Sequence, residues 1–159
     1  MKPRGRLAAP LIAAVLLLTT GCGGGGRDAT GAQDPDPGRF SSAADTTTCL
    51  GDATAVTSTP DDYPASFPLP AGTIVFNVED RGADGVIATG VTATPFDDVL
   101  GAMNAAKKAG FRVTSGETEA DDAEASWVGG GFTGRWAIKK SATCPGETVV
   151  QLLSRSRRG

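Results

Sequence analysis

Six short stretches in the second half of the chain have the residue pattern of β-strands, and in the first of them the apolar residues Ile74, Phe76 and Val78 alternate onto one face. These stretches cover residues 73–78, 86–94, 111–115, 125–129, 134–140 and 148–153. The polar, Gly-containing segment 79–85 separates the first two stretches and predicts a β-hairpin between them. The pattern is that of a small, β-rich domain.

Between residues 94 and 110 the alternation gives way to a helical period. One face of this segment is apolar, and it consists of Phe96, Val99, Leu100, Met103 and Ala106. Thr94 is the expected N-cap residue, and Pro95 suits the first helical position. Gly110 followed by Phe111 predicts a left-handed glycine stop. The segment is therefore expected to be one amphipathic helix.

The order of these elements predicts the fold class. Adjacent hairpins and a single helix favour an α+β two-layer domain over residues 49–154, in which an antiparallel sheet of about five or six strands packs on one helix in the order ββαβββ(β). The proline-rich arm, residues 63–72, is expected to be extended and to cover one edge of the core, with partner binding as the alternative. Residues 155–159 are expected to form a basic tail that frays after the last strand.

The first 21 residues have a different pattern from the rest of the chain. Three basic residues, Lys2, Arg4 and Arg6, precede an apolar run from Leu7 to Leu18. This run is about a dozen residues long, whereas a membrane-spanning helix needs about 20. A basic start, a short apolar run and a small-residue exit predict a secretory signal peptide over residues 1–21.

A cysteine follows at the position where such a signal peptide would end. The segment Thr19-Thr20-Gly21-Cys22 resembles the lipobox of bacterial lipoprotein precursors, in which small or apolar residues and then Gly or Ala precede an invariant Cys. It departs from the usual pattern at Thr19, where Leu is common. The resemblance implies cleavage before Cys22, a lipid with acyl chains such as palmitate on that residue, and anchoring at the extracytoplasmic face of the cell membrane. An ordinary secreted protein with an incidental Cys22 is the alternative.

Residues 22–48 form a Gly-, Asp-, Pro- and Thr-rich stretch in which Phe40 is the only large apolar residue. Such a composition buries too little apolar surface to offset the entropy of ordering, so a disordered tether is expected. Removal of residues 1–21 takes away three of the 15 Lys and Arg and none of the 18 Asp and Glu, which changes the formal net charge from −3 to −6. The chain is similar in composition to small uncharacterised lipoproteins of high-GC Gram-positive bacteria.

The chain contains no His, which excludes Ser-His-Asp and Cys-His catalytic sets and the common His-containing zinc sites. With Cys22 lipidated, Cys49 and Cys144 remain, and two cysteines in an exported chain are expected to pair as a disulfide. No metal, cofactor or catalytic residue is assigned. Aromatic residues make up 6% of the chain and its net charge is negative, so no nucleic-acid partner is expected.

Three further features are candidates for binding sites. Trp127, Arg135 and Trp136 are candidates for a sugar-binding face, with core packing of the indoles as the alternative. The acidic segment 117–124 is expected to be a solvated loop, with a Ca²⁺ site as the alternative. The glycine-rich segment 129–134 matches the GxGxxG pattern of dinucleotide-binding motifs. In those motifs a helix follows, whereas here the following residues predict a strand, so a hairpin loop is predicted.

Together these features predict a membrane-anchored extracytoplasmic lipoprotein with a non-enzymatic binding or interaction domain. Its expected contacts are the membrane, through the lipid on Cys22, and an envelope protein or polysaccharide. Two alternatives stay open. A hydrolase of envelope polymers that works through carboxylates predicts two acidic side chains facing one cleft. A structural accessory subunit of an envelope complex predicts a large exposed apolar patch.

Overall fold

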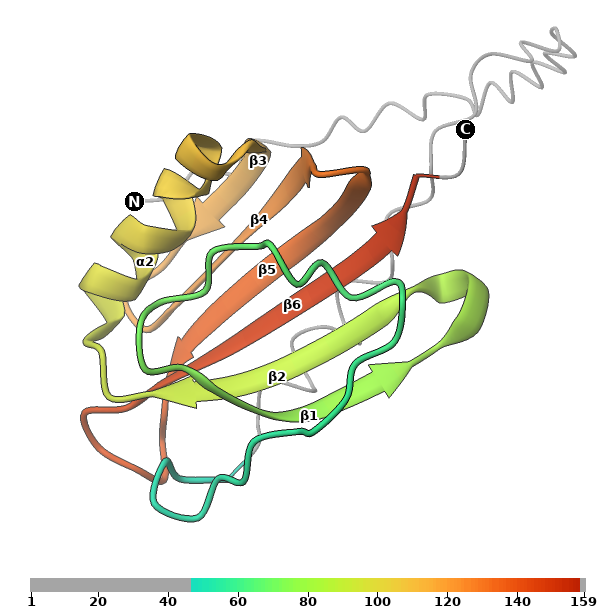
Figure 1. The fold of residues 1–159 in the computed structure, drawn as a ribbon. Helices are drawn as coiled ribbons and strands as arrows, with labels where there is room; N and C mark the ends of the chain where they lie inside the picture. Colours follow the sequence, from blue (N-terminus) through green and yellow to red (C-terminus); the bar gives the residue numbers. More distant parts are fainter. Residues whose placement is uncertain (1–46, 158–159) are drawn as a thin grey trace, which may run out of the picture. The chain divides into compact units, whose positions relative to one another are not determined.

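A computed structural model gives the fold of the protein and describes residues 47–157 (Figure 1). The predicted signal peptide over residues 1–21, the predicted lipidation site Cys22 and the predicted tether as far as residue 46 lie outside the described residues. No helix within the described range combines the length and the apolar character needed to cross a membrane.

Six strands, one α-helix and two 3₁₀ helices follow one another along the described chain. They are β1 (Ile74–Asp80), η1 (Gly82–Asp84), β2 (Val86–Thr92), α2 (Phe96–Asn104), η2 (Ala105–Ala109), β3 (Phe111–Thr118), β4 (Asp122–Gly129), β5 (Phe132–Lys140) and β6 (Thr148–Ser156). Each of the six predicted stretches corresponds to a strand, although Thr73 precedes β1 and residues 93–94 follow β2, and β1 and β2 form the predicted antiparallel hairpin. The last strand ends later than predicted, because Arg155 of the expected tail keeps a ladder partner, Thr133.

The six strands form one sheet in the spatial order β1-β2-β6-β5-β4-β3, and all neighbours are antiparallel. The predicted α+β class, an antiparallel sheet with one helix, is confirmed. The predicted succession ββαβββ(β) does not hold as the order of strands in the sheet, because β6 lies between β2 and β5 (Figure 1). Leu152 of β6, for example, is in register with Ala88 of β2 and with Trp136 of β5. Alternation identifies the two faces of a strand but not its neighbours, which is why the sequence pattern did not reveal this order.

The helical segment is less regular than its pattern predicts. The α-helix α2 has nine residues, and the five-residue 3₁₀ helix η2 continues it to Gly110, which has a φ of 89° and is the predicted glycine stop. The predicted apolar face is buried at Phe96, Val99, Met103 and Ala106. The N-cap prediction was wrong: the cap residue is Pro95, and the Thr94 hydroxyl donates to the carbonyl O of Ala71 at 3.4 Å and accepts no hydrogen bond from a helix N–H.

The main core lies between one face of the sheet and the elements that cover it. Phe67 of the proline-rich arm packs with its ring centroid 5.0 Å from that of Phe111 and 4.9 Å from that of Trp127. The arm crosses the same face of the sheet that α2 covers (Figure 1). The arm therefore packs on the core, but it crosses a face of the sheet instead of covering one edge. Turns interrupt its expected extended course, such as the one closed by the hydrogen bond of 2.8 Å from the Phe67 N–H to the carbonyl O of Pro64.

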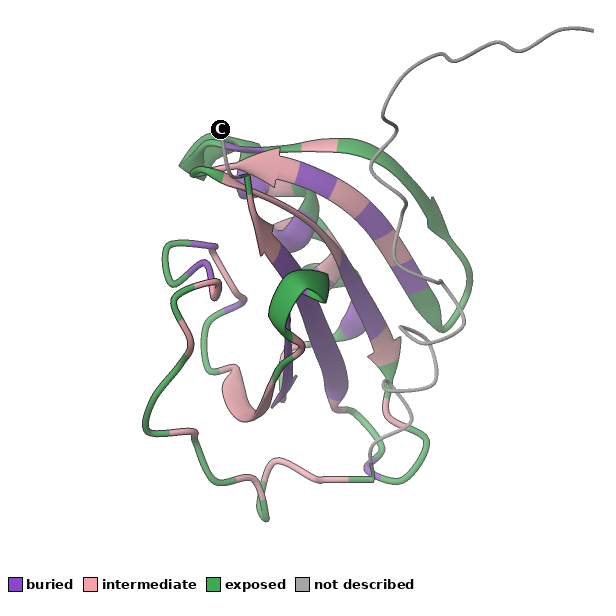
Figure 2. Cartoon of the chain, turned by 90° about the vertical axis from the view of Figure 1, so that its right-hand side faces the viewer, coloured by how far each residue is buried: buried purple, intermediate pink, exposed green. Residues whose placement is uncertain are grey.

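Burial decreases from the centre of the sheet towards β3 (Figure 2). β2 is buried at every residue, and β6 is buried from Thr148 to Ser154. β3 is exposed from Thr114 to Thr118, although it is a regular member of the sheet. The β3 end of the sheet is therefore its accessible end.

Candidate functional site

Two shallow cavities lie beside the exposed half of β3, with volumes of about 270 and 280 Å³. Both are lined by the same residues of β3 and β4, which are Ser115, Gly116, Glu117, Glu124 and Ala125. Trp136 adds to the first cavity and Arg135 to the second. These two residues are neighbours on β5, and successive side chains of a strand point to opposite faces of the sheet. The two cavities therefore flank the strand pair on its two faces, and we call these residues together the β3–β4 site.

A β-bulge in β3 lies at the start of this site. Val113 is in register with Trp127 and Ser115 with Ser126, so β3 holds one residue more than β4 over this interval. A bulge bends its strand and increases the local twist. Val113 and Thr114 of the bulge line the first cavity, and the second begins directly after the bulge at Ser115.

Gly116 forms part of the wall that the two cavities share. A Cβ atom at Gly116 would stand 2.6 Å from the Cβ of Ala125 and 2.7 Å from the carbonyl O of Glu124. Non-bonded contacts of a Cβ atom are essentially never this short, so a side chain at this position would force β3 and β4 apart. Glycine therefore allows the close approach of the two strands. The missing side chain also leaves the backbone of β3 exposed beside the cavities.

Two carboxylates and one guanidinium determine the charge of the site. Glu117 and Glu124 are register partners on β3 and β4, and the Cβ atoms of such partners lie about 4.5–5.5 Å apart. Arg135 Nη2 donates to Glu124 Oε1 in an ion pair, with 12% of the Arg135 side chain and 23% of the Glu124 side chain exposed. One cation thus accompanies two anions, and the site has a net negative formal charge.

The acidic segment 117–124 is exposed over residues 117–122, as predicted, but it is a hairpin whose loop is limited to residues 119–121. Its ends lie in β3 and β4, and a hydrogen bond of 2.8 Å from the Glu119 N–H to the carbonyl O of Asp122 closes the turn. Lys140 Nζ lies 2.9 Å from Asp121 Oδ1 and holds the turn against β5. The charged residues fit in these strands because the β3 end of the sheet is open to solvent, where their side chains remain hydrated.

The structure separates the three residues that were predicted to form a sugar-binding face. Arg135 and Trp136 line the two cavities, whereas Trp127 packs in the core against Phe67 and Phe111. Both indoles are only 1% exposed, so neither offers a free ring face on which a sugar could stack. Their placement corresponds to the core-packing alternative.

Sequence reasoning missed the small residues of the site. Ser115 and Gly116 line both cavities and Ser126 lines the second, and none of them was singled out. One signal was present, since a glycine inside a strand pattern marks a bulge or a close backbone approach. The serines carried no signal of their own, because their role depends on which strands pair.

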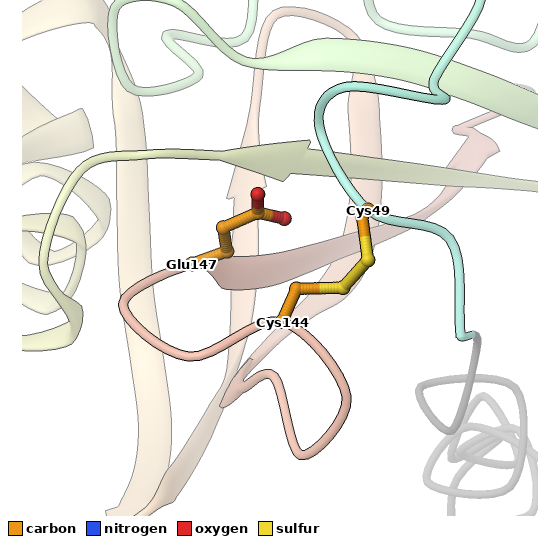
Figure 3. Close-up of side chains that lie close together, drawn as sticks. All are labelled: Cys49, Cys144 and Glu147. Carbon is orange, nitrogen blue, oxygen red and sulfur yellow. A yellow bond between two sulfur atoms is a disulfide. The ribbon is translucent and has the colours of Figure 1, made fainter.

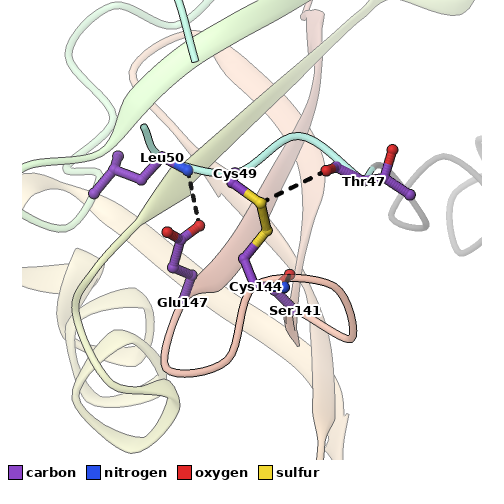
Figure 4. The surroundings of a disulfide bond; sticks show 6 residues. All are labelled: Thr47, Cys49, Leu50, Ser141, Cys144 and Glu147. Atoms are coloured by element: carbon purple, nitrogen blue, oxygen red, sulfur yellow. Dashed lines mark hydrogen bonds between the residues drawn. A yellow bond between two sulfur atoms is a disulfide. The ribbon is translucent and has the colours of Figure 1, made fainter. Parts of the chain in front are cut away.

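A disulfide joins Cys49 to Cys144 across a sequence separation of 95, as predicted (Figure 3). The two Cα atoms lie 5.7 Å apart. Glu147 lies beside the bridge, and its Oε2 accepts a hydrogen bond of 2.8 Å from the Leu50 N–H (Figure 4). The Cys144 N–H donates to Ser141 Oγ at 2.9 Å. The bridge and the Glu147 bond attach the first described residues to the loop between β5 and β6.

Within residues 47–157, Cys49, Cys144 and Glu147 are the only three potential metal ligands whose donor atoms all lie within 4.8 Å of one another. The two sulfur atoms are bonded to each other, so in this oxidised state they are not thiolate ligands. The carboxylates of segment 117–124 form no such group in the described part of the chain. The alternative of a Ca²⁺ site in that segment gains no support from their arrangement.

The glycine-rich segment 129–134 forms a hairpin, as predicted, although its loop is limited to Gly130 and Gly131. Gly130 and Gly131 connect β4 to β5 with φ angles of 58° and 84°, a region that glycine enters at no steric cost. The strand β5 follows directly, so no helix terminus is present to bind a phosphate at this loop.

Comparisons with known proteins give no relative of this chain, because no family model, no curated protein and no solved structure matches it. Its function is therefore inferred from its own residues. The exposed half of β3, the two cavities and the negative charge are the properties of the β3–β4 site from which we infer it.

Proposed function

We propose that the protein is a lipoprotein anchored at the extracytoplasmic face of the cell membrane, and that its domain binds an envelope protein or polysaccharide without catalysing a reaction. The observation that carries the binding function is the β3–β4 site, where an exposed strand lies between two cavities. The basic and apolar leader that ends at Cys22 supports the anchoring.

The disulfide also supports export of the domain. Disulfides persist in oxidising compartments and are rare where thiol reductants keep cysteines reduced. The Cys49–Cys144 bridge links the beginning of the described domain to the loop before its last strand. A small domain placed outside the cytoplasmic membrane gains most from a cross-link of this kind.

The anchoring is tested by the chemistry of Cys22. We expect the membrane-fraction protein to begin at Cys22 and its N-terminal peptide to carry the mass of a diacylglycerol and acyl chains. Globomycin should block its processing, and a Cys22→Ala variant should lose the lipid. A wild-type peptide that carries no lipid would overturn the anchoring.

One observation favours the hydrolase as a second candidate function. Glu117 and Glu124 both line the two cavities, and paired carboxylates are the usual machinery of glycoside hydrolysis. The Glu124 carboxylate already forms an ion pair with the Arg135 guanidinium, however, and this interaction favours ligand binding over a role of Glu124 as a catalytic acid or base.

Purified envelope polysaccharide distinguishes the two functions. If the domain only binds, the protein co-sediments with the insoluble polymer and releases no new reducing ends. Turnover that disappears in a Glu117→Gln variant, with the fold unchanged by circular dichroism, would establish the hydrolase instead.

A further inference from the structure

The two edge strands of the sheet differ in whether another part of the chain forms backbone hydrogen bonds with their outer side. β1 and β3 are the edge strands, and β1 is partly covered because the Val56 N–H donates to the carbonyl O of Val75 at 2.9 Å. For β3, no backbone hydrogen bond within residues 47–157 other than those of the β3–β4 ladder involves residues 112–118. Its outer N–H and C=O groups therefore meet solvent along an exposed strand.

An exposed edge is a template for one more strand. Native proteins usually prevent unwanted strand pairing at such edges, and the bulge before Ser115 disrupts pairing along the first half of β3. The stretch Ser115–Thr118 after the bulge pairs with β4 without further irregularity. At about 3.3 Å per residue, this stretch offers a pairing length of roughly 13 Å.

The two cavities adjoin the edge of the sheet, because residues of the edge strand β3 line both of them. An extended peptide that pairs with a sheet edge points alternate side chains to the two faces, and pockets on those faces supply its specificity. Ser115, Gly116 and Glu117 of the open edge line both cavities, one on each face. Both cavities extend inward from β3 over β4 and β5, so a peptide beside β3 would reach them with long side chains that lean across Ser115, Gly116 and Glu117.

The charge around the edge indicates the kind of side chain that fits. Five acidic residues lie between 117 and 124, namely Glu117, Glu119, Asp121, Asp122 and Glu124. Arg135 pairs with Glu124 and Lys140 with Asp121, and Lys139 lies opposite Asp122 in the β4–β5 ladder. Five carboxylates thus face three cations, which leaves the hairpin with an excess of negative charge. Lys and Arg side chains complement such a surface, and an acidic peptide would be repelled by it.

We propose that the edge of β3 at Ser115–Thr118 binds an extended, Lys- or Arg-containing segment of a partner protein as a seventh strand of the sheet. This inference rests on the proposed binding function and specifies its partner as a polypeptide. The backbone of β3 supplies the affinity, and Glu117, which belongs to both cavities, selects the basic side chains.

The proposal is tested on the mature lipidated chain in a neutral detergent, with a synthetic peptide of alternating Lys and Val as the probe. We expect the probe to bind and to slow hydrogen exchange of the amides in residues 112–118. A Glu/Val peptide of the same length should bind more weakly. A Lys/Val peptide with Pro at alternate positions should not bind, because Pro cannot donate to a strand ladder.

Two charge reversals provide the matched variants. Glu117→Lys should weaken binding of the Lys/Val peptide by about tenfold, and the Glu/Val peptide should then bind the variant better than it binds the wild type. Glu119→Lys changes the same charge on the same hairpin, outside the residues that line the cavities, and should have a much smaller effect.

Three results would overturn the proposal: failure of the Lys/Val peptide to bind, equal binding of the proline-containing peptide, or exchange protection confined to other strands. The broader binding function is judged separately. If the protein still co-sediments with envelope material and loses this in Glu117→Lys, the β3–β4 site binds a ligand other than a strand. If the lipid on Cys22 is absent, the anchoring fails whatever the peptide does.

Discussion

Gly134 lies directly opposite Trp127 across the β4–β5 pair, and a Cβ atom at Gly134 would stand only 2.7 Å from Cζ2 of the indole. The same Cβ would lie 2.0 Å from the carbonyl O of Leu153 on β6. The tryptophan ring therefore occupies the space that a side chain at Gly134 would need. Gly134, the last glycine of the sequence that matches the dinucleotide-binding motif, therefore leaves room for the core residue Trp127.

Replacing this glycine should destabilise the domain. We expect Gly134→Ala to lower the free energy of unfolding by about 2–3 kcal/mol, since the added methyl group forces the indole or the backbone of β6 to move. Denaturant unfolding followed by tryptophan fluorescence measures this. The control is Gly101→Ala in α2, where nothing lies within 4 Å of the new Cβ and stability should rise by up to about 1 kcal/mol. Equal stability of Gly134→Ala and the wild type would contradict the packing described above.

Loss of the disulfide should have a larger effect. A bridge that spans a sequence separation of 95 restricts the unfolded chain strongly, and the chain-entropy estimate for such a loop is about 4–5 kcal/mol. We expect a Cys49→Ala/Cys144→Ala variant to unfold at a correspondingly lower denaturant concentration. The wild type in the presence of a reductant should match the variant. A reductant that leaves the midpoint unchanged would show that the bridge does not form in solution.

Glu147 should contribute to stability in concert with the disulfide. Its carboxylate accepts the Leu50 N–H at 2.8 Å, next to Cys49, so both interactions hold the same segment. We expect Glu147→Ala to cost about 1 kcal/mol and Glu147→Gln less, because the glutamine amide still offers an oxygen acceptor. A double-mutant cycle with the cysteine variant should give a coupling of at least about 0.5 kcal/mol. Strict additivity would mean that the two interactions act independently.

Tyr63 should make the domain sensitive to alkaline pH. Burial raises the pKa of the Tyr63 phenol above its ordinary value of 10.0, because the charged phenolate loses hydration. The folded state then holds this proton more tightly than the unfolded state does. Tyr63 thus has no effect on the pH dependence of stability below pH about 10, and it lowers stability as the pH rises through the folded pKa.

A Tyr63→Phe variant should lack that part of the alkaline loss of stability. The comparison with the wild type isolates Tyr63 from the lysines, which titrate in both proteins. The chain contains one Tyr, so phenolate absorbance reports the titration of this residue alone. Identical alkaline stability curves for the two proteins, or a phenol that titrates at its ordinary pKa, would contradict the burial of Tyr63.

The position of each strand could be predicted from the sequence, whereas the arrangement of the strands could not. In β1, for example, the apolar residues Ile74, Phe76 and Val78 recur at every second position, and this signal is local. The pairing of Leu152 with both Ala88 and Trp136 joins residues far apart in the chain. No periodicity encodes that choice, because it depends on the packing of the whole sheet.

The candidate site was harder to predict than the fold for a related reason. The cavities arise from a shift of register between Val113 and Ser115 and from the closeness of Gly116 to Ala125. Both features depend on the relation between two strands. The sequence instead pointed to Trp127 and Trp136 as candidates for a binding face. Aromatic side chains suit a binding face and a core equally well, and Trp127 belongs to the core.

The central position of β6 has a consequence for how the domain is built. The hairpin of β1 and β2 and the three strands β3, β4 and β5 share no strand pairing, and only β6 pairs with both groups. Yet β6 is the last of these strands to leave the ribosome. The sheet is therefore continuous only once β6 has paired on both sides, and a chain that ended before Thr148 would contain two groups of strands with no pairing between them.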